Sequence, residues 1–317
     1  MDNGLITFII VTWNNEKQIE KCLDTLAQFT TAPHKIIIVD NVSTDETCNI
    51  VVKKYPLVQL IKSNENLGFA KGNNIALKKV QTPYVCFINP DVILTEDITL
   101  PAINILEQDK NIGLVTNKLC NVDGSNQPTT GRFTDLVSIL VNVCHLYHFI
   151  PNTFKKTLCP EYYKIEHGVF FPDWVIGAEM FMRTSDAKKI GGFSIDYYMY
   201  MEDMDICWKV WHQLNKKVLY NADISMIHLG GASEKQNQNY SKQEKLYINT
   251  FLFCKKYYGI KKTYRLYKLI MDLYKIRMIL IYPLKFVNKK NQIFEHEKNV
   301  LKILKSLDCN NKLQGNF

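Results

Sequence analysis

Apolar runs alternate with amphipathic stretches through the first 90 residues of the chain. The run from Ile6 to Val11 is almost wholly apolar, and after a short polar loop the stretch from Glu16 to Gln28 carries apolar residues at helical spacing. Further apolar runs occur at Lys35 to Val39, Val58 to Ile61 and Tyr84 to Ile88. Strands that are apolar along their whole length are buried on both faces, as in a parallel sheet covered by helices. The pattern therefore predicts an α/β fold.

Polar and acidic residues gather where the predicted strands end. Asp40 closes the second apolar run, the triplet Asn89-Pro90-Asp91 follows the fourth, and His228 follows a later one. The acidic segment Glu202-Asp203-Met204-Asp205 begins a predicted helix. Because loops at the carboxyl ends of parallel strands converge on one crevice, we expect these groups to lie close together. Carboxylates gathered in this way suit a divalent cation, a diphosphate and one proton transfer.

A polar loop from Asn64 to Asn74 is predicted between the third strand and a helix from Ile75 to Val80. Gly68 and Gly72 permit a ligand to approach the backbone closely, and Lys71 can contact a phosphate. Glycine loops are common, so this loop alone identifies no ligand.

Seven stretches of the chain resemble the motifs of one enzyme family and occur in that family's order, between about residues 5 and 235. They are Val11-Thr12-Trp13-Asn14, Val39-Asp40-Asn41 with Ser43 and Asp45, Asn66-Leu67-Gly68-Phe69-Ala70 with Gly72-Asn73-Asn74, Asn89-Pro90-Asp91, Gly177-Ala178-Glu179-Met180, Gly191-Gly192-Phe193 and Tyr200-Met201-Glu202-Asp203-Met204-Asp205. The chain is similar to family 2 glycosyltransferases of the GT-A fold, most closely to the rhamnosyltransferase-type branch of bacterial polysaccharide enzymes. The resemblance implies a mixed, mainly parallel sheet flanked by helices, and transfer of a sugar with inversion from a nucleotide diphosphate donor.

In that family the nucleotide lies at the ends of the first strands. The resemblance therefore implies donor binding by Thr12, Asn14, Asp40, Asn41, Asn66, Gly68, Lys71, Asn73, Asn89 and Asp91. A carboxylate or amide there can pair with the imide edge of uracil or thymine. Asp40 has an alternative role as the cap of the following helix. The implied donor is dTDP-rhamnose first, and a UDP-hexose second.

The resemblance also implies a divalent cation, Mg²⁺ or Mn²⁺, at Asp91 and His228. The family's metal motif is often Asp-x-Asp, and here Asn89 stands in the first position, which leaves Asp91 as the carboxylate ligand. One carboxylate is sufficient when the diphosphate and water supply the remaining oxygens, and an imidazole ligand favours Mn²⁺ over Mg²⁺. The alternatives are a Pro-Asp turn at a strand end and a structural histidine.

Inverting transfer needs a base for the acceptor hydroxyl proton, and the resemblance assigns that role to Asp203. Glu202 is the alternative base, because sequence alone does not separate two adjacent acids. Glu202 and Asp205 can orient the acceptor or interact with the positive end of the helix, and Trp174 can stack on a sugar face. The resemblance places Gly177 in the turn that leads into the acceptor region. Trp174 has core packing as an alternative role, and Gly177 a structural turn.

Positive charge is concentrated in the C-terminal part of the chain. Residues 1–235 carry 22 Lys/Arg and 26 Asp/Glu, and residues 236–317 carry 17 and 5. We therefore predict a catalytic domain at 1–235 and a basic helical extension at 236–317. In the extension, basic residues recur on one face of an amphipathic helix: Lys261, Arg265, Lys268 and Lys275. This face suits an anionic membrane surface, while the apolar face alternatively packs on the catalytic domain or on a second copy of the chain.

The remaining features concern location and acceptor. The chain has nine cysteines without a Cys-x-x-Cys pair and no signal-like N-terminus, which favours a cytoplasmic protein that can rest on the inner face of the membrane. Residues 133–150 are expected to form an amphipathic insertion over the acceptor site.

The expected acceptor is a glycan or a lipid-linked sugar, and nucleic acid is not expected, because no recognition motif accompanies the charge. The alternatives are a nucleotidyltransferase and a non-catalytic subunit that binds sugar nucleotides.

Overall fold

The computed structural model describes residues 4–163, 165–197, 199–230, 242–284 and 288–309. Cα packing divides the chain into two units. Unit 1 comprises Met1–Arg132 and Pro160–Asn237, and unit 2 comprises Phe133–Cys159 and Gln238–Phe317. The predicted boundary at residue 235 lies outside the described residues. The segment from Phe133 to Cys159 groups with the C-terminal helices, a long-range association that the sequence pattern did not indicate.

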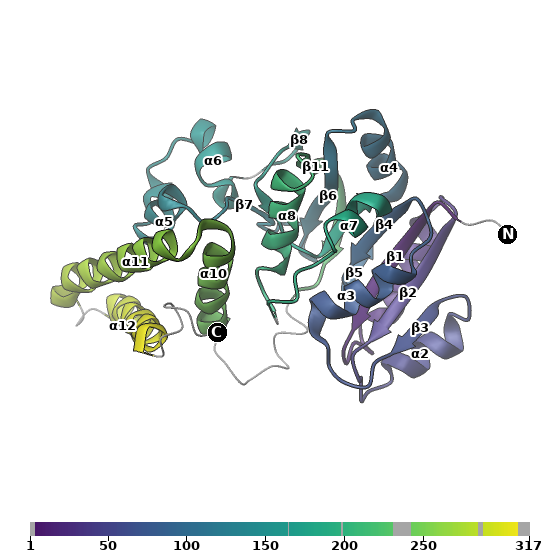
Figure 1. Ribbon diagram of the computed structural model, residues 1–317, viewed down its shortest axis with the longest axis horizontal. Helices are drawn as coiled ribbons and strands as arrows, with labels where there is room; N and C mark the ends of the chain where they lie inside the picture. Colours follow the sequence, from purple (N-terminus) through teal and green to yellow (C-terminus); the bar gives the residue numbers. More distant parts are fainter. Residues whose placement is uncertain (1–3, 164, 198, 231–241, 285–287, 310–317) are drawn as a thin grey trace. The chain divides into compact units, whose positions relative to one another are not determined.

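The strands of unit 1 form a nine-stranded mixed sheet and a two-stranded one (Figure 1). The main sheet has the order β3-β2-β1-β4-β10-β6-β11-β5, with β8 paired to β11. The strands are β1 (Ile6–Thr12), β2 (His34–Asp40), β3 (Gln59–Lys62), β4 (Tyr84–Ile88), β5 (Val92–Leu94), β6 (Ile112–Cys120), β8 (Val169–Phe170), β10 (Glu179–Arg183) and β11 (Lys217–His228). Strands β7 (Thr130–Gly131) and β9 (Trp174–Val175) form the small sheet. The predicted mixed, mainly parallel sheet is confirmed.

Strand directions bring the predicted site residues to one edge of the sheet. β1 is parallel to β2 and β4, β10 is antiparallel to both β4 and β6, and β6 is parallel to β11. The carboxyl ends of β1, β2, β4, β6 and β11 therefore share that edge, where a crevice forms in sheets of this order.

Helices cover both faces of this sheet. On one face, buried residues of α1 (Ile19–Phe29), α2 (Thr47–Lys54) and α4 (Thr99–Gln108) pack with strand residues such as Phe8 and Ile38 in one apolar cluster. The other face carries α3 (Gly68–Lys79), α7 (Thr184–Lys189) and α8 (Glu202–His212). The predicted α/β layering is therefore confirmed.

Helix α3 begins at Gly68, earlier than the predicted start at Ile75. The side chain of Asn66 accepts a hydrogen bond from the N–H of Gly68 at 3.0 Å, which supplies an acceptor for one free N–H of the first turn. A Cβ at Gly72 would lie 2.9 Å from a methyl carbon of Val11, so this glycine lets the helix pack closely on β1. Gly72 therefore serves packing and is not part of a ligand loop.

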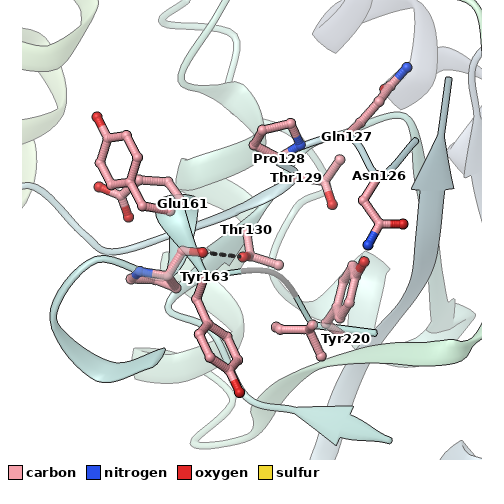
Figure 2. Close-up of a pocket in the computed structure, with 11 residues that line it drawn as sticks. Asn126, Gln127, Pro128, Thr129, Thr130, Glu161, Tyr163 and Tyr220 are labelled. Carbon is pink, nitrogen blue, oxygen red and sulfur yellow. Dashed lines mark hydrogen bonds between the residues drawn. The ribbon is translucent and has the colours of Figure 1, made fainter. Parts of the chain in front are cut away.

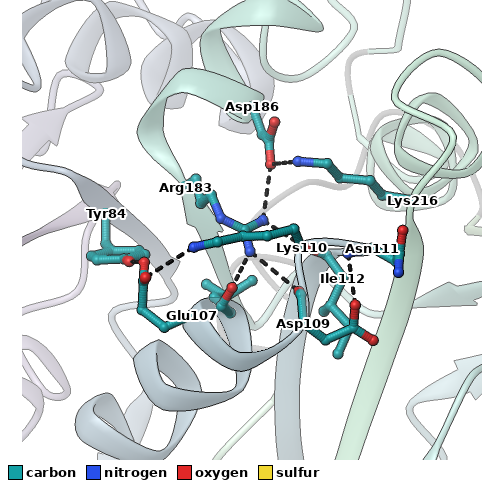
Figure 3. A network of polar contacts seen from close by, with 10 residues as sticks. Tyr84, Glu107, Asp109, Lys110, Asn111, Ile112, Arg183, Asp186 and Lys216 are labelled. Atoms are coloured by element: carbon teal, nitrogen blue, oxygen red, sulfur yellow. Dashed lines mark hydrogen bonds and ion pairs between the residues drawn. The ribbon is translucent and has the colours of Figure 1, made fainter.

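Arg183 ties the end of α4 to β10 (Figure 3). Its guanidinium donates to the carbonyl groups of Leu106, Ile112 and Asp109, the second at 2.7 Å. It also pairs with Asp186, which Lys216 contacts at 2.6 Å. A cation at the C-terminal end of a helix satisfies free carbonyl groups and interacts favourably with the helix dipole.

Unit 2 is helical in its described part. It contains α5 (Leu136–Val143), α6 (Asn152–Leu158), α10 (Lys242–Tyr258), α11 (Ile260–Ile281) and α12 (Asn288–Cys309), with short 3₁₀ turns at Leu146–His148 and Tyr282–Leu284. Helix α11 packs on α10, α12 and α5, and it buries Leu266, Tyr267 and Ile270 there. The apolar face of the predicted amphipathic helix is thus covered by other helices of its own unit.

A buried ion pair crosses this helical unit. Arg277 of α11 lies 2.6 Å from Glu297 of α12, whose side chain is almost fully buried. None of the helices in the described part of the chain is both long and apolar enough to span a bilayer.

Candidate active site

The ends of β1 and β2 are joined by side-chain hydrogen bonds. The hydroxyl of Thr12 donates to Asp40 at 3.0 Å, and Ser43 donates to the same carboxylate from its hydroxyl at 2.5 Å and from its N–H at 2.9 Å. Asp40 is only 2% exposed. Helix α2 has Glu46 at its N-cap, so Asp40 does not cap that helix, which corrects the capping alternative. Instead it holds the turn that follows β2.

Asn14 joins the same network. Its N–H donates to the hydroxyl of Ser43 at 2.9 Å, and its side-chain oxygen accepts from the N–H of Thr44 at 2.8 Å. Asn14 has a φ of +52° and Val42 a φ of +62°. This region is unfavourable for a β-branched residue, so the network holds a strained loop at the crevice.

Asn41 links β2 to the start of α3. Its amide donates to the carbonyl of Gly68 at 3.2 Å and accepts from the N–H of Leu67 at 3.4 Å. Together with the bond from Gly68 to Asn66, this fixes the loop that enters α3. The structure therefore brings together three residues that were predicted to bind the donor: Asn41, Asn66 and Gly68.

Lys71 and Asn73 lie on different sides of α3. Lys71 is exposed and lines a groove of ≈ 820 Å³ with Phe193 and Ile195. Asn73 is 1% exposed, and its amide donates to the carbonyl of Phe69 at 3.0 Å. The amide of Asn73 is therefore buried and bonded to the backbone of its own helix, a position that does not fit the predicted contact with the nucleotide.

Asp91 and His228 meet at the ends of β4 and β11. Asp91 Oδ1 and His228 Nε2 are 3.4 Å apart, and both residues are 7% exposed. The N–H of Leu229 donates to the carbonyl of Asp91 at 3.0 Å, and His228 pairs with Val92 across β5 and β11. These backbone contacts hold the two side chains together.

The Asp91 and His228 pair fits a cation that takes most of its ligands from elsewhere. Two ligand atoms, each about 2.1 Å from one ion, can be up to about 4.2 Å apart, so a separation of 3.4 Å is compatible with shared ligation. The described residues contain no group of three or more His, Cys, Asp or Glu placed to hold an ion. A diphosphate and water would supply the other oxygens.

The triplet Asn89-Pro90-Asp91 lies next to the start of α8. The N–H of Asn89 donates to the carbonyl of Ala178 at 2.9 Å. The neighbouring Gly177 faces α8, and a Cβ there would lie only 3.4 Å from the Cβ of Asp203. The backbone just before β10 therefore lies beside the first turn of α8, where a Cβ would be in ordinary van der Waals contact with Asp203. Through Ala178 and Gly177, the structure brings the predicted metal motif and the predicted base into one region.

The backbone before α8 is strained. Tyr200 has a φ of +72° and Met201 a φ of +76°, two successive residues in a conformation that glycine normally adopts. Strain of this kind persists only where the surrounding structure enforces it, and it concentrates at functional sites. These two residues immediately precede α8, so their conformation sets the direction in which the first turn of the helix, with Glu202 and Asp203, leaves the loop.

Glu202 and Asp203 are carboxyl groups with altered acidity. Burial raises the pKa of both, and the charge of Asp203 raises the pKa of Glu202 further. Hydrogen bonds from the N–H groups of Met204 and Gly177 partly offset the rise for Asp203. In the described part of the chain, Oε2 of Glu202 has no hydrogen-bond partner. A carboxyl group with a raised pKa can accept a proton near neutral pH.

Two predicted acceptor residues have structural contacts instead. Asp205 has no exposed surface, and its carboxylate pairs with Lys209 at 3.2 Å and accepts from Tyr197 at 3.2 Å. The indole of Trp174 lies over Gly131 and donates to the carbonyl of Arg132 at 3.1 Å. Direct contact between Asp205 and an acceptor does not fit this burial, and Trp174 holds β7 against β9.

Glu179 and Gln127 lie near the candidate site, but the sequence analysis predicted no function for either residue. Glu179 on β10 is fully buried and accepts hydrogen bonds from Thr116 and Asn117. Its burial raises its pKa to about 7, although those bonds oppose the rise. The sequence could have indicated Glu179, because it is an acidic residue at the start of an otherwise apolar run. Gln127 had no such signal.

Gln127 contacts His228 and belongs to a hairpin that borders a pocket of ≈ 270 Å³ (Figure 2). Tyr163 and Tyr220 line this pocket, and Asn126 points towards Tyr220. A few polar groups among aromatic rings are typical of sites for small organic ligands.

Comparison with known proteins identifies the family. The family model described as glycosyl transferase family 2 matches residues 7–171, just over half of the chain. The chain belongs to glycosyl transferase family 2. An N-acetylglucosaminyl-diphospho-decaprenol L-rhamnosyltransferase of Mycobacterium tuberculosis is 24% identical over 213 residues, which are 64% of this chain and 69% of that protein. Rhamnosyltransferase WbbL of Escherichia coli is 27% identical over 217 residues, or 65% of this chain and 76% of WbbL.

Solved structures of glycosyltransferases share the fold. Mannosyltransferase PcManGT from Pyrobaculum calidifontis, in complex with GDP-Man and Mn²⁺, has a TM-score of 0.58 at 15% identity, covering 96% of this chain and 87% of that one. Staphylococcus aureus TarS 1-349 in complex with UDP-GlcNAc has a TM-score of 0.52 at 20% identity, covering 85% and 66%. The predicted GT-A fold is therefore confirmed. The family match identifies the protein as a glycosyltransferase enzyme, in place of the nucleotidyltransferase alternative.

Proposed function

We propose that this glycosyltransferase transfers one sugar, rhamnose in preference to a hexose, with inversion from a dTDP- or UDP-sugar to a glycan or lipid-linked acceptor in bacterial surface polysaccharide assembly. The observation that carries the proposal is the juxtaposition of the Asp91 and His228 pair with Asp203 through Ala178 and Gly177. The rhamnosyltransferases of M. tuberculosis and E. coli support the choice of sugar, and a decaprenol-linked acceptor in the first supports a lipid-linked one.

The donor would lie along the ends of β1, β2 and β4. Asn14 would contact the base from a loop that Thr12 and Asp40 hold in place, while Asn41, Asn66 and Gly68 shape the loop beside it. Lys71 and Asn89 would contact the diphosphate. Asp91 and His228 would hold a divalent cation, which stabilises the negative charge of the departing diphosphate.

Asp203 would act as the base. As its carboxylate takes the proton of the acceptor hydroxyl, that oxygen forms a bond to the anomeric carbon from the face opposite the diphosphate. The bond from the anomeric carbon to the diphosphate oxygen breaks, and the electron pair leaves with the diphosphate. Glu202, whose pKa is also raised by burial, would remain protonated beside it and orient the acceptor. The pocket lined by Tyr163 and Tyr220 supports a sugar-containing acceptor.

The test is a calorimetric titration of the protein with dTDP, UDP and GDP, each with and without Mn²⁺. Metal-dependent binding of dTDP or UDP is expected. Asp91→Ala should weaken the metal-dependent part about 10- to 100-fold and leave metal-free binding unchanged. Equal binding by the variant with Mn²⁺ would remove Asp91 from the metal site, and a preference for GDP would contradict the proposed donor.

We further propose that unit 2 contacts the cytoplasmic face of an anionic membrane through α11. Lys261, Arg265, Lys268 and Lys275 are exposed on this helix, and large apolar side chains near its end are exposed as well: Ile276, Ile279, Leu280 and Tyr282. A basic face next to exposed apolar groups is typical of helices that lie in the membrane interface.

Neutralising the four basic residues should weaken binding to phosphatidylglycerol vesicles by about 1 kcal/mol per residue. A variant with four exposed lysines of unit 1 neutralised serves as the control. Retention of the first variant on vesicles at physiological salt would contradict the membrane role of these residues. A dimer of the wild type in sedimentation would favour a second copy as the partner of this surface.

A further inference from the structure

The hairpin after β6 holds His228 from the side away from Asp91. Gln127 Oε1 lies 2.9 Å from His228 Nδ1, and Gln127 Nε2 donates to the backbone carbonyl of His228 at 2.6 Å. The same Nε2 donates to the side-chain oxygen of Asn121 at 2.8 Å. One amide thus contacts both the ring and the backbone of a residue 101 positions away.

The hydrogen bonds fix which end of the Gln127 amide faces the ring. A carbonyl oxygen only accepts, so the group beside the His228 carbonyl is the NH₂ of Gln127. Its two protons go to His228 O and to Asn121 Oδ1. The group facing Nδ1 is therefore the oxygen of Gln127, which can only accept, so Nδ1 carries the proton.

This arrangement leaves Nε2 as the ring nitrogen that can bind a cation when the imidazole is neutral. In a neutral imidazole with a proton on Nδ1, Nε2 carries a lone pair. That lone pair faces Asp91 Oδ1 at 3.4 Å, an approach of two electron-rich atoms that a cation between them would stabilise. Metal-binding histidines generally donate the N–H of their other nitrogen to a neighbouring acceptor, which fixes the tautomer and the ring orientation.

The hairpin that carries Gln127 is well fixed. The N–H of Gln127 donates to the carbonyl of Leu119 at 2.9 Å, and Asn121 bonds to Ser125 through backbone and side chain, both at 2.8 Å. Ser125 also donates to Asp123. The acceptor for His228 Nδ1 is therefore supplied by an ordered turn and does not depend on a flexible side chain alone.

We propose that Gln127 is a positioning residue that holds His228 in the Nδ1–H tautomer and presents Nε2, beside Asp91, to a divalent cation. The inference rests on the proposed function for the metal role of His228. It adds a residue outside the seven sequence stretches that resemble the family's motifs, and it assigns a role to the hairpin at 121–127. Gln127 does not touch the substrate.

The tautomer can be measured directly by long-range ¹H–¹⁵N correlation spectra of the full chain labelled with ¹⁵N-histidine and free of metal. His228, assigned through His228→Ala, should show a single Nδ1–H tautomer in the wild type. Gln127→Met has a similar shape but no hydrogen-bonding amide, and it should give a mixture of tautomers. Gln127→Glu keeps an acceptor for Nδ1–H but loses the two donors to His228 O and Asn121 Oδ1. It should restore the single Nδ1–H tautomer, because that tautomer depends on the acceptor. Val122→Ala changes an exposed side chain of the same hairpin and should leave the pattern unchanged.

Mn²⁺ binding supplies the second readout, followed by electron paramagnetic resonance with and without UDP. Gln127→Met should weaken Mn²⁺ binding about 10- to 100-fold, and Gln127→Glu should retain affinity within a few-fold of the wild type. A single unchanged tautomer in Gln127→Met, or wild-type Mn²⁺ affinity in that variant, would overturn the inference. The proposed metal role of His228 would still stand if His228→Ala weakens Mn²⁺ binding. If His228→Ala binds Mn²⁺ as the wild type does, both the metal role of His228 and the inference are wrong.

Discussion

Two halves of the main sheet use their polar residues in different ways. In the parallel half (β3, β2, β1 and β4), the side chains at the strand ends bond to one another, as when Asp40 accepts from Thr12 and Ser43. In the mixed half (β10, β6, β11 and β5, with α8), Glu179, Glu202 and Asp203 have pKa values raised by burial. Asp40 thus sets the shape of a loop in the parallel half, whereas Glu179, Glu202 and Asp203 are groups of the mixed half that can change protonation near neutral pH.

Asp40 and Glu202 differ in the hydrogen-bond donors around each carboxylate. Asp40 lies beside short hydroxyl-bearing residues that follow the strand end, so donors are close at hand. Glu202 lies in the first turn of α8, and its Oε2 has no hydrogen-bond partner in the described part of the chain. A buried carboxylate with few donors is more easily protonated. We therefore expect substitutions in the mixed half to change catalysis and pH dependence, and those in the parallel half to change stability and donor affinity.

The largest expected effect is that of Asp203→Asn. Loss of the base should lower turnover by about 10²- to 10⁴-fold, while the affinity for dTDP or UDP with Mn²⁺ stays within a few-fold of the wild type. Product formation and calorimetry measure the two quantities. Glu202→Gln is the matched control, because it removes the adjacent carboxyl group and keeps its shape.

If turnover falls in Glu202→Gln and is retained in Asp203→Asn, then Glu202 is the base. In the wild type, the base must be ionised, and its pKa is raised. The activity should therefore fall with decreasing pH at a higher pH than an ordinary aspartate would give. An equal loss of nucleotide affinity in Asp203→Asn would contradict a role confined to the acceptor.

The next effect concerns Glu179 and the pH dependence of stability. Its pKa is raised to about 7, above the ordinary value of 4.5, so the folded protein binds this proton more tightly than the unfolded chain does. The resulting stability is complete below about pH 4.5 and is lost as the pH rises through about 7. The free energy involved is about 3 kcal/mol.

Glu179→Gln cannot ionise, so its unfolding free energy should fall less than that of the wild type between pH 5 and about pH 8. Urea unfolding at several pH values measures the slopes. The comparison uses slopes because the amide also changes the hydrogen bonds with Thr116 and Asn117 at every pH. The exposed residue Glu65 supplies the control Glu65→Gln, which should retain the wild-type slope. Identical slopes for Glu179→Gln and wild type would contradict the raised pKa.

Sequence patterns predicted the strand ends well and the side-chain partners poorly. The apolar runs located β1 to β4, and polar residues after them located the loops, because both signals are local. The early start of α3 was missed because it depends on the side chain of Asn66, and the burial of Asn73 followed from that start. The contact between Gln127 and His228 depends on the pairing of β6 with β11, which includes a register shift between Asn221 and Ser225. Strand register over such separations is not encoded in a local pattern.

The smallest expected effect tests the parallel half at Asp40. Asp40→Ala leaves the N–H and hydroxyl of Ser43 and the hydroxyl of Thr12 without their acceptor, in a site that is 2% exposed. The unfolding free energy should fall by about 1–3 kcal/mol, and donor affinity should fall because the loop that carries Asn14 bonds to Ser43. Val52→Ala, on an exposed side chain of the nearby helix α2, should change neither quantity by more than about 0.5 kcal/mol. Turnover at saturating donor should remain near the wild-type value in Asp40→Ala. A large loss of turnover at saturation, with stability unchanged, would show that Asp40 takes part in the chemical step and would remove the distinction between the two halves of the sheet.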